Sequence, residues 1–337
     1  MIWQTRASKA LELDSTAYLW KRLGTVSRNL PETHDLLRAF RALLSIVAPS
    51  VFLLAEAIES QASVVPFFGT PKDRECDLAY NNGVMTALWG ALADQKVDIL
   101  TKVITTAAEK PDHGQWLNYV RCHDDIIWLA LSDSAPQERL QHWSDFFAGK
   151  DSYAKGMAFQ APPGFPASGC GMAASLCGGL DDALAIDRLK LLYGVTYALE
   201  GVPLLYMGDE IALENFEDFR NDGTLKDELR WLHRPTMDWE KATARNDRTT
   251  PQGQMYIFLA ELAQRLAILP FAPGMRVMEP AHPSILHLER PLETGTFICH
   301  ANFSQTPVSV TVPGTLIIGN EGTILAPYAV NWYMKGV

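Results

Sequence analysis

The chain has 337 residues, 47% of them hydrophobic, and its 29 basic and 39 acidic side chains leave a formal net charge of −10. That is enough apolar material for one large domain or two smaller ones, which argues against a disordered chain. The acidic balance argues against a protein that holds nucleic acid by neutralising phosphates, and it favours a neutral or cationic small molecule as the ligand.

The sequence also indicates a cellular compartment. Its first residues lack the basic segment and apolar core of a signal peptide, and no run has the roughly 18 uncharged apolar residues that a membrane span needs. The five cysteines are widely spaced, which fits reduced thiols better than a disulfide framework or a zinc site. These features predict a cytoplasmic protein without a membrane segment.

The first part of the chain alternates strand-like and helix-like segments. Residues 10–14 predict a short strand, and apolar residues then recur at helical spacing from Pro31, which suits a first helical turn, to about Pro49. The continuous apolar run 51–54 predicts a strand that is buried on both faces. Together these segments predict a strand–helix–strand unit.

The alternation continues to about residue 270. The sequence predicts further strands at 75–80, 116–122 and 202–207, helical stretches at 82–108 and 182–199, and an irregular section between 122 and 182. Such alternation is typical of a parallel sheet covered by helices. The polar residues 208–250 predict a long loop, which is followed by a last helix at about 254–269.

The pattern changes at residue 277. Short segments rich in β-forming residues then alternate with proline and glycine breaks, which predicts a small antiparallel domain. The predicted organisation is an α/β portion over residues 1–275 and a C-terminal β-sandwich domain over residues 276–337.

Acidic residues follow several of the predicted strands. Asp14, Glu56 and Asp124 do so, and so does the pair Asp209–Glu210. In a barrel of parallel strands the C-terminal ends face one mouth, so carboxylates from different strands converge there. A retaining glycosidase needs such a pair, one ionised as nucleophile and one protonated as acid. The alternative is that each acid caps the helix that follows it.

Seven segments carry a longer pattern, and they are LDSTAYLWKRLGT (13–25), LLAEAI (53–58), ECDLAYNNGVM (75–85), NYVRCHDDIIW (118–128), GVPLLYMGDE (201–210), LRWLHRP (229–235) and ARNDRTTPQGQMY (244–256). They resemble, in the same order, motifs of the amylosucrase branch of glycoside hydrolase family 13, the α-amylase superfamily. The resemblance runs from about residue 10 to the C-terminus. It implies an α/β fold with about strands 4 to 8 of a (β/α)8 TIM barrel, followed by a small antiparallel β domain.

The resemblance also implies roles for individual residues. Asp14 matches the family's nucleophile after the fourth barrel strand, and Glu56 matches the general acid/base after the fifth. His123 and Asp124 match the pair after the seventh strand that binds sugar hydroxyls in the cleavage subsite. Arg245 resembles the arginine that closes the floor of the pocket in amylosucrases.

On this basis Asp124 counts with Asp14 and Glu56 as a catalytic acid, and Asp125 counts with His123 and Arg245 as a substrate-binding residue. The resemblance implies sucrose as glucosyl donor, an α-glucan as acceptor, and no metal or other cofactor for the chemistry.

The chain departs from the family pattern in two ways. The family has an arginine two residues before the nucleophile, whereas this chain has Glu12, on the same face of the strand as Asp14. A carboxylate in place of a cation predicts that Asp14 ionises less readily. Only about ten residues precede Asp14, so the first three strands of the barrel are missing from the sequence. Open barrel edges predict self-association or pairing with another chain.

Two functions therefore remain open. The chain is either a retaining α-glucoside hydrolase or glucosyltransferase of the amylosucrase type, or a truncated, non-catalytic paralogue or gene fragment that binds saccharide or a partner chain. The two departures favour an inactive chain.

Overall fold

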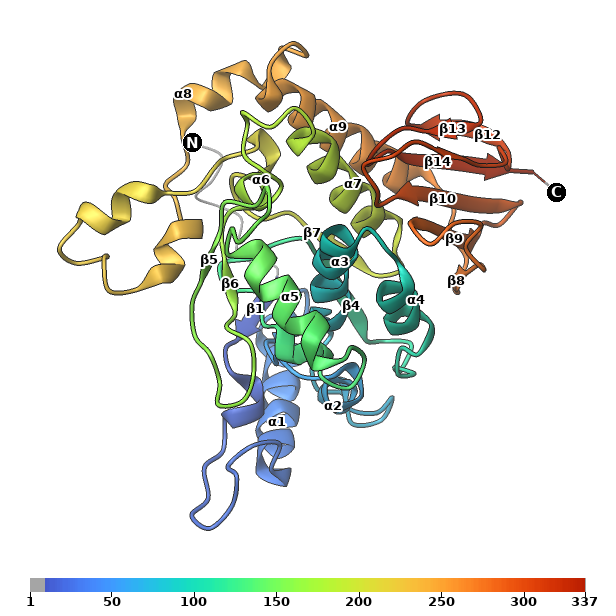
Figure 1. The fold of residues 1–337 in the computed structure, drawn as a ribbon. Coiled ribbons are helices and arrows are strands. Elements are labelled where there is room, and N and C mark those ends of the chain that lie inside the picture. The colour runs from blue at the N-terminus through green and yellow to red at the C-terminus, as the bar shows by residue number, and fades with distance from the viewer. Residues whose placement is uncertain (1–9, 337) are drawn as a thin grey trace. The chain divides into compact units, whose positions relative to one another are not determined.

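The computed structural model describes residues 10–336 (Figure 1). Residues 1–9, which bear on the signal-peptide prediction, lie outside the described residues. The chain forms two compact units, one of residues 10–83 and 107–117 and the other of residues 84–106 and 118–336. The predicted boundary between residues 275 and 276 stays a prediction. No helix within residues 10–336 is long and apolar enough to cross a membrane.

The first unit is built on parallel strands in the order β1-β2-β3-β4, and the last of these continues into the second unit at Asn118. Leu13 lies opposite Ala55 in this sheet, so β1 and β2 end side by side. The strands agree with those predicted from the sequence, and they are β1 (Ala10–Leu13), β2 (Phe52–Ala55), β3 (Leu78–Tyr80) and β4 (Gln115–Tyr119).

The helix α1 (Pro31–Val47) connects β1 to β2. It packs on the sheet through Leu37, which is fully buried together with Leu53 and Ala55 of β2. Phe52, at the start of β2, is half exposed, so only the last three residues of this strand are buried as predicted. Shorter helices complete the unit, and they are η2 (Thr16–Tyr18), α2 (Gln61–Val64) and η3 (Val65–Phe68).

In the second unit the end of β4 has β7 (Val202–Leu204) as its neighbour in the sheet. The predicted helical stretch 82–108 is two helices, and the predicted helices at 182–199 and 254–269 are present. The helices are α3 (Asn82–Asp94), whose first two residues belong to the first unit, α4 (Asp98–Thr105), α7 (Ala185–Ala198) and α9 (Pro251–Ile268).

One helix lies in the section that the sequence predicts to be irregular. It is α5 (Gln137–Phe147), and it buries Leu140, Trp143 and Phe147 at helical spacing. Most of its other residues are polar, so the apolar face is only three residues long and gives a weak signal. The rest of this section is short, and consists of η4 (Trp128–Leu131), β5 (Met157–Ala158), β6 (Gly169–Cys170) and α6 (Ala173–Leu176).

The polar stretch 208–250 holds only short helices, in agreement with the predicted loop. They are η5 (Asp209–Ile211), η6 (Glu217–Asn221), η7 (Leu229–His233), α8 (Trp239–Ala242) and η8 (Thr243–Asn246). The chain then enters α9, whose N-cap Thr250 accepts a hydrogen bond from the Gly253 amide.

The C-terminal residues form an antiparallel sheet in the order β12-β14-β10-β9-β8, coloured red and orange beside α7 and α9 in Figure 1. Trp332 donates from Nε1 to the carbonyl of Gly194 in α7, at 3.1 Å. A parallel sheet followed by an antiparallel β domain confirms the predicted fold class. The strands are β8 (Arg276–Val277), β9 (Ile285–Pro291), β10 (Thr296–Asn302), β12 (Thr315–Ile318) and β14 (Val330–Lys335), with a separate pair β11 (Val308–Ser309) and β13 (Ile324–Leu325).

Candidate active site

The first unit brings two of the predicted catalytic acids to the same end of its sheet. Asp14 and Glu56 are the residues that directly follow the paired ends of β1 and β2. The Ser15 amide donates to Glu56 Oε2 at 2.7 Å, and the Thr16 amide donates to the Glu56 carbonyl at 2.8 Å. Since these bonds tie the turn after β1 to Glu56, the structure fixes the two residues, here called the acid pair, relative to each other.

Local backbone geometry and burial distinguish the members of the acid pair. Ser15 has a φ of 50°, a left-handed conformation that non-glycine residues rarely adopt, so the chain turns sharply directly after Asp14. Asp14 is exposed, whereas Glu56 is 9% exposed. One acid is therefore open to solvent and the other is enclosed, the asymmetry that a nucleophile and a general acid require.

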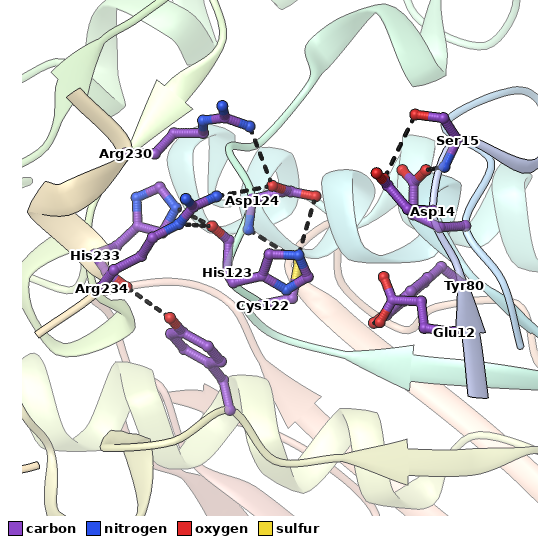
Figure 2. Close-up of polar contacts among 12 residues, drawn as sticks. Glu12, Asp14, Ser15, Tyr80, Cys122, His123, Asp124, Arg230, His233 and Arg234 are labelled. Atoms are coloured by element: carbon purple, nitrogen blue, oxygen red, sulfur yellow. Dashed lines mark hydrogen bonds and ion pairs between the residues drawn. The ribbon is translucent and has the colours of Figure 1, made fainter. Parts of the chain in front are cut away.

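Glu12 lies on the strand that leads to Asp14. Its Oε2 accepts a hydrogen bond from the hydroxyl of Tyr80, on β3, at 3.0 Å (Figure 2). Within residues 10–336, neither Glu12 nor Asp14 forms an ion pair with a basic side chain. The described part of the first unit thus supplies no cation at the position where the resemblance has an arginine.

The second unit holds three more predicted site residues, His123, Asp124 and Asp125, shortly after β4. Asp124 Oδ1 accepts from Arg234 Nη2 at 3.2 Å and from Arg230 Nη1 at 3.4 Å, and Asp124 Oδ2 lies 3.6 Å from His123 Nε2 (Figure 2). The His123 side chain is 48% exposed and that of Asp124 is 20% exposed. His123 can therefore reach a ligand, while Asp124 is held between arginines. We call these four residues the His123–Asp124 element.

Buried donors fix the backbone of this element. Arg121 is fully buried and donates from Nη2 to the Asp124 carbonyl at 2.8 Å and from Nε to the Gly171 carbonyl at 3.0 Å. The His123 carbonyl accepts from Arg234 Nε at 2.7 Å and from His233 Nε2 at 3.0 Å. Because a carbonyl only accepts, His233 carries its proton on Nε2.

Burial and neighbouring charge set the ionisation around this element. Burial, with the charge of Arg121 second, lowers the pKa of His233 to about 2, so this imidazole stays neutral. Hydrogen bonds from Arg230 lower the pKa of Glu228 to about 2. The pKa of Arg230 is raised in return, first by its bond to Glu228 and then by the charges of nearby acids that include Asp125.

The surroundings of Arg245 differ from those of Arg121, Arg230 and Arg234. It is exposed, and its Nη1 donates at 3.0 Å to the carbonyl of Ala242, the last residue of the preceding helix α8. No acidic side chain in the described part of the chain forms a salt bridge with it. Its role in closing the pocket floor stays a prediction.

The buried carboxyl of Asp209 follows the predicted strand at 202–207. It is fully buried and accepts a short hydrogen bond from the hydroxyl of Tyr193. Burial raises its pKa to about 7, so the group titrates near neutral pH. Within residues 10–336 no group of His, Cys, Asp and Glu side chains is arranged to hold a metal ion.

Sequence reasoning missed Arg121, Arg230 and Arg234, the cations that surround Asp124. Arg230 and Arg234 belong to the quoted segment LRWLHRP, but they lie more than 100 residues from Asp124 in an irregular stretch. Arg121 belongs to the quoted segment NYVRCHDDIIW, and its burial was the missing information.

Comparison with known proteins gives distant relatives. No family model matches the chain. It is 27% identical over 245 residues to the trehalose synthase/amylase TreS of Mycolicibacterium smegmatis (strain ATCC 700084 / mc(2)155), covering 72% of this chain and 38% of that protein. It is 29% identical over 213 residues to TreS of Mycobacterium tuberculosis (strain ATCC 25618 / H37Rv), covering 63% of this chain and 32% of that protein. The chain thus spans about a third of the length of these relatives.

A solved structure shares the fold. The sucrose 6F-phosphate phosphorylase from Thermoanaerobacter thermosaccharolyticum superposes with a TM-score of 0.69 at 14% identity, over 88% of this chain and 55% of that one. Its likeness agrees with a partial α-amylase-type barrel followed by a β domain. The chain is thus similar in sequence to these trehalose synthases and in fold to this phosphorylase.

Proposed function

We propose that this chain carries the acid pair and the sugar-binding element of a retaining α-glucoside hydrolase or glucosyltransferase, and that it binds α-glucosides without turning them over. The observation that carries the proposal is the fixed placement of Asp14 and Glu56 at adjacent strand ends, tied by the bond from the Ser15 amide to Glu56 Oε2. Retaining enzymes of this class act through such a pair of carboxyl groups.

In an active enzyme, each acid of the acid pair has one task. Glu56, the enclosed acid, protonates the glycosidic oxygen of the leaving group, while Asp14 attacks the anomeric carbon and forms a covalent glucosyl-enzyme. Water or a sugar hydroxyl, deprotonated by Glu56, then releases the glucosyl group. His123, which is half exposed, and Asp124 bind sugar hydroxyls, with Asp125 and Arg245 as further substrate contacts.

We propose that Glu12 makes the chain inactive. It adds a carboxylate on the strand that leads to the nucleophile, where a cation would favour ionisation of Asp14. The alternative, an active enzyme, is supported by the intact acid pair. The two differ in one outcome, the turnover of substrate by the unmodified chain.

The donor sugar is sucrose or trehalose. The resemblance to amylosucrases favours sucrose, and the name of the structural neighbour, a sucrose 6F-phosphate phosphorylase, is in keeping with it. The names of the curated relatives favour trehalose. We take sucrose as the first candidate and trehalose as the second. A cytoplasmic location remains part of the proposal, and the five cysteines, which are buried thiols, agree with it.

The experiment measures release of fructose from sucrose, and of glucose from trehalose, by the purified chain and by Glu12→Arg. We expect no release by the unmodified chain and measurable release by Glu12→Arg, because the arginine favours the ionised nucleophile. Tyr80→Phe is the matched control, since it removes the hydrogen-bond donor to Glu12 without adding a cation. This variant should release neither fructose nor glucose.

Each outcome is decisive. Release by the unmodified chain would overturn inactivity and establish the enzyme. If neither the unmodified chain nor Glu12→Arg releases sugar, Glu12 is not the cause of the inactivity. Activity of Glu12→Arg must disappear again when Asp14→Asn is added, or Asp14 is not the nucleophile.

A further inference from the structure

Two ionisable side chains of the second unit are fully buried and interact with each other. Arg121 lies shortly after β4, and Asp209 is the first residue of η5, and both are 0% exposed. Charged side chains are almost never fully buried unless they are paired. The positive charge of Arg121 favours the ionised form of Asp209, so the two groups act on each other inside the protein.

The guanidinium of Arg121 has one nitrogen that its known contacts do not use. Nη2 donates to the Asp124 carbonyl and Nε to the Gly171 carbonyl, whereas Nη1 is buried without a hydrogen-bond partner within residues 10–336. A guanidinium is planar and presents its donors in a rigid fork, so a force on one nitrogen moves the whole group. The hold on the Asp124 carbonyl therefore depends on what attracts Nη1.

The carboxyl of Asp209 has a matching unused atom. One oxygen, Oδ2, accepts a hydrogen bond from the hydroxyl of Tyr193 on α7. The other, Oδ1, is buried and has no hydrogen-bond partner in the described part of the chain. An ionised carboxylate attracts the Nη1 of Arg121 strongly in a buried environment, and a protonated carboxyl does not.

Other groups also face Asp209. Burial raises its pKa to about 7, while the hydrogen bond from Tyr193 and then the charge of Arg121 favour the ionised form. The groups around it come from several elements, and they are Tyr193 on α7, Arg121 after β4, Tyr206 after β7, Glu210 beside it on η5, and Cys177 and the backbone of Ala173 at the two ends of α6. Arg121 is the cation of this set, so ionisation of Asp209 acts on it.

We propose that Asp209 is a positioning residue for the His123–Asp124 element and that it acts through Arg121. The ionised carboxylate holds the guanidinium from a third side, so that Nε and Nη2 keep the carbonyls of Gly171 and Asp124 in place. Protonation of Asp209 removes this hold and loosens the backbone at Asp124. The consequence for sugar binding rests on the proposed function: the chain binds α-glucosides more tightly when Asp209 is ionised.

The test follows backbone amides of the sugar-free full chain by NMR, over about two pH units on either side of 7. The amide of Asp125 shares a peptide group with the Asp124 carbonyl, so it reports the hydrogen bond from Arg121. The amide of Met172 reports the bond to Gly171 in the same way. We expect both amide resonances to shift with one midpoint near pH 7, and we expect Asp209→Asn to lose this shift.

A matched control is available in the same spectra. The amide of Glu200 shares a peptide group with the Leu199 carbonyl, which accepts from Nη1 of another buried arginine, Arg290, at 3.2 Å. Because Arg290 is not among the groups that act on Asp209, the Glu200 amide should not follow this titration.

A second variant keeps the proposal testable if Asp209→Asn folds poorly. Tyr193→Phe removes the hydrogen bond that favours ionised Asp209 and leaves the carboxyl in place, so the midpoint should move to higher pH. If Asp209 only fills space, the amides of Asp125 and Met172 will not respond to its ionisation. Their insensitivity to pH in the unmodified chain, or a midpoint that neither substitution changes, would overturn the proposal.

Titration calorimetry with sucrose and trehalose on the same samples separates this inference from the proposed function. We expect binding to tighten as the pH rises through 7 in the unmodified chain, and Asp209→Asn to lack this increase. Comparing the two chains cancels the titration of every group that they share. Sugar binding combined with amides that ignore Asp209 would overturn the positioning role and leave the proposed function standing. Amides that titrate with Asp209 in a chain that binds neither sugar would support the positioning role and contradict the proposed function.

Discussion

Arg121 shows how much of the candidate site depends on a residue that is fully buried. Its guanidinium holds the carbonyls of Asp124 and Gly171 from a fully buried position. Removing it leaves both acceptors without a donor, and a hydrogen bond to a charged group contributes about 1.5–3 kcal/mol.

We expect Arg121→Met to lower the free energy of unfolding by about 2–4 kcal/mol. Urea denaturation measures the change. The control is Arg245→Met, because Arg245 is exposed and donates only to the nearby carbonyl of Ala242, and it should change stability by less than about 0.5 kcal/mol. Equal effects of the two substitutions would contradict the role given to Arg121.

The raised pKa of Asp209 predicts how the stability of the chain depends on pH. Burial raises its pKa to about 7 in the folded chain, against roughly 4 when unfolded. A raised carboxyl pKa contributes stability that is fully present below the unfolded value and is lost as pH rises through the folded value, because the unfolded chain releases the proton first. The loss falls between about pH 4 and pH 7 and amounts to at most about 4 kcal/mol.

Asp209→Asn cannot ionise, so its stability should decline less than that of the unmodified chain between these pH values. Thermal or urea unfolding at several pH values measures how steeply the free energy of unfolding falls as the pH rises. Asp218→Asn, at an exposed position on η6, serves as control and should leave the slope unchanged. If Asp209→Asn keeps the full slope, Asp209 is not the group responsible.

The residues of the candidate site differ in how well the sequence predicts them. The sequence predicts Asp14, Glu56 and Asp124 because each follows an apolar run within a segment that carries the resemblance, and their catalytic roles stay predictions. Arg230 and Arg234 could not, since the segment that carries them has no periodicity that would direct it to Asp124. Glu12 was visible in the sequence as a departure, but its partner Tyr80, two strands away, required the structure.

At the scale of elements, the contact of α7 with β14 depends on one glycine. A Cβ built on Gly194 would lie 2.5 Å from Cγ1 of Val330, closer than real Cβ atoms approach a neighbour. The Gly194 carbonyl also accepts the bond from Trp332. The helix therefore approaches the sheet more closely than a larger residue would allow.

We expect Gly194→Ala to destabilise the chain by about 1–3 kcal/mol through overpacking. Alanine favours a helix by about 1 kcal/mol over glycine, so an open helix would instead gain stability. Urea denaturation shows whether the substitution lowers or raises the free energy of unfolding. Gly223→Ala, where a Cβ meets nothing within 4 Å, is the control and should be close to neutral. A stabilised Gly194→Ala would contradict the packing described.

Elements with strong apolar periodicity were predicted correctly. α1, α7 and α9 each follow a long helical pattern, and β2 follows a continuous apolar run. α5 was missed because its buried face consists of three residues in a polar segment. The order of strands in the sheets depends on contacts between distant segments. The resemblance implied it for the parallel sheet, whereas the order β12-β14-β10-β9-β8 of the antiparallel sheet was not predicted.

At the scale of the whole molecule, the residues of the proposed function lie in two separately described units. The acid pair belongs to the first unit and the His123–Asp124 element to the second.

Titration calorimetry with sucrose and with trehalose tests the central claim most directly, because it asks whether the chain binds α-glucosides at the His123–Asp124 element. We predict saturable binding that His123→Ala weakens by roughly tenfold, equivalent to about 1.4 kcal/mol. His142→Ala is the matched control, since His142 is equally exposed and also lies near an aspartate, and it should bind as the unmodified chain does. No saturable binding of either sugar, or equal binding by His123→Ala and His142→Ala, would contradict the account.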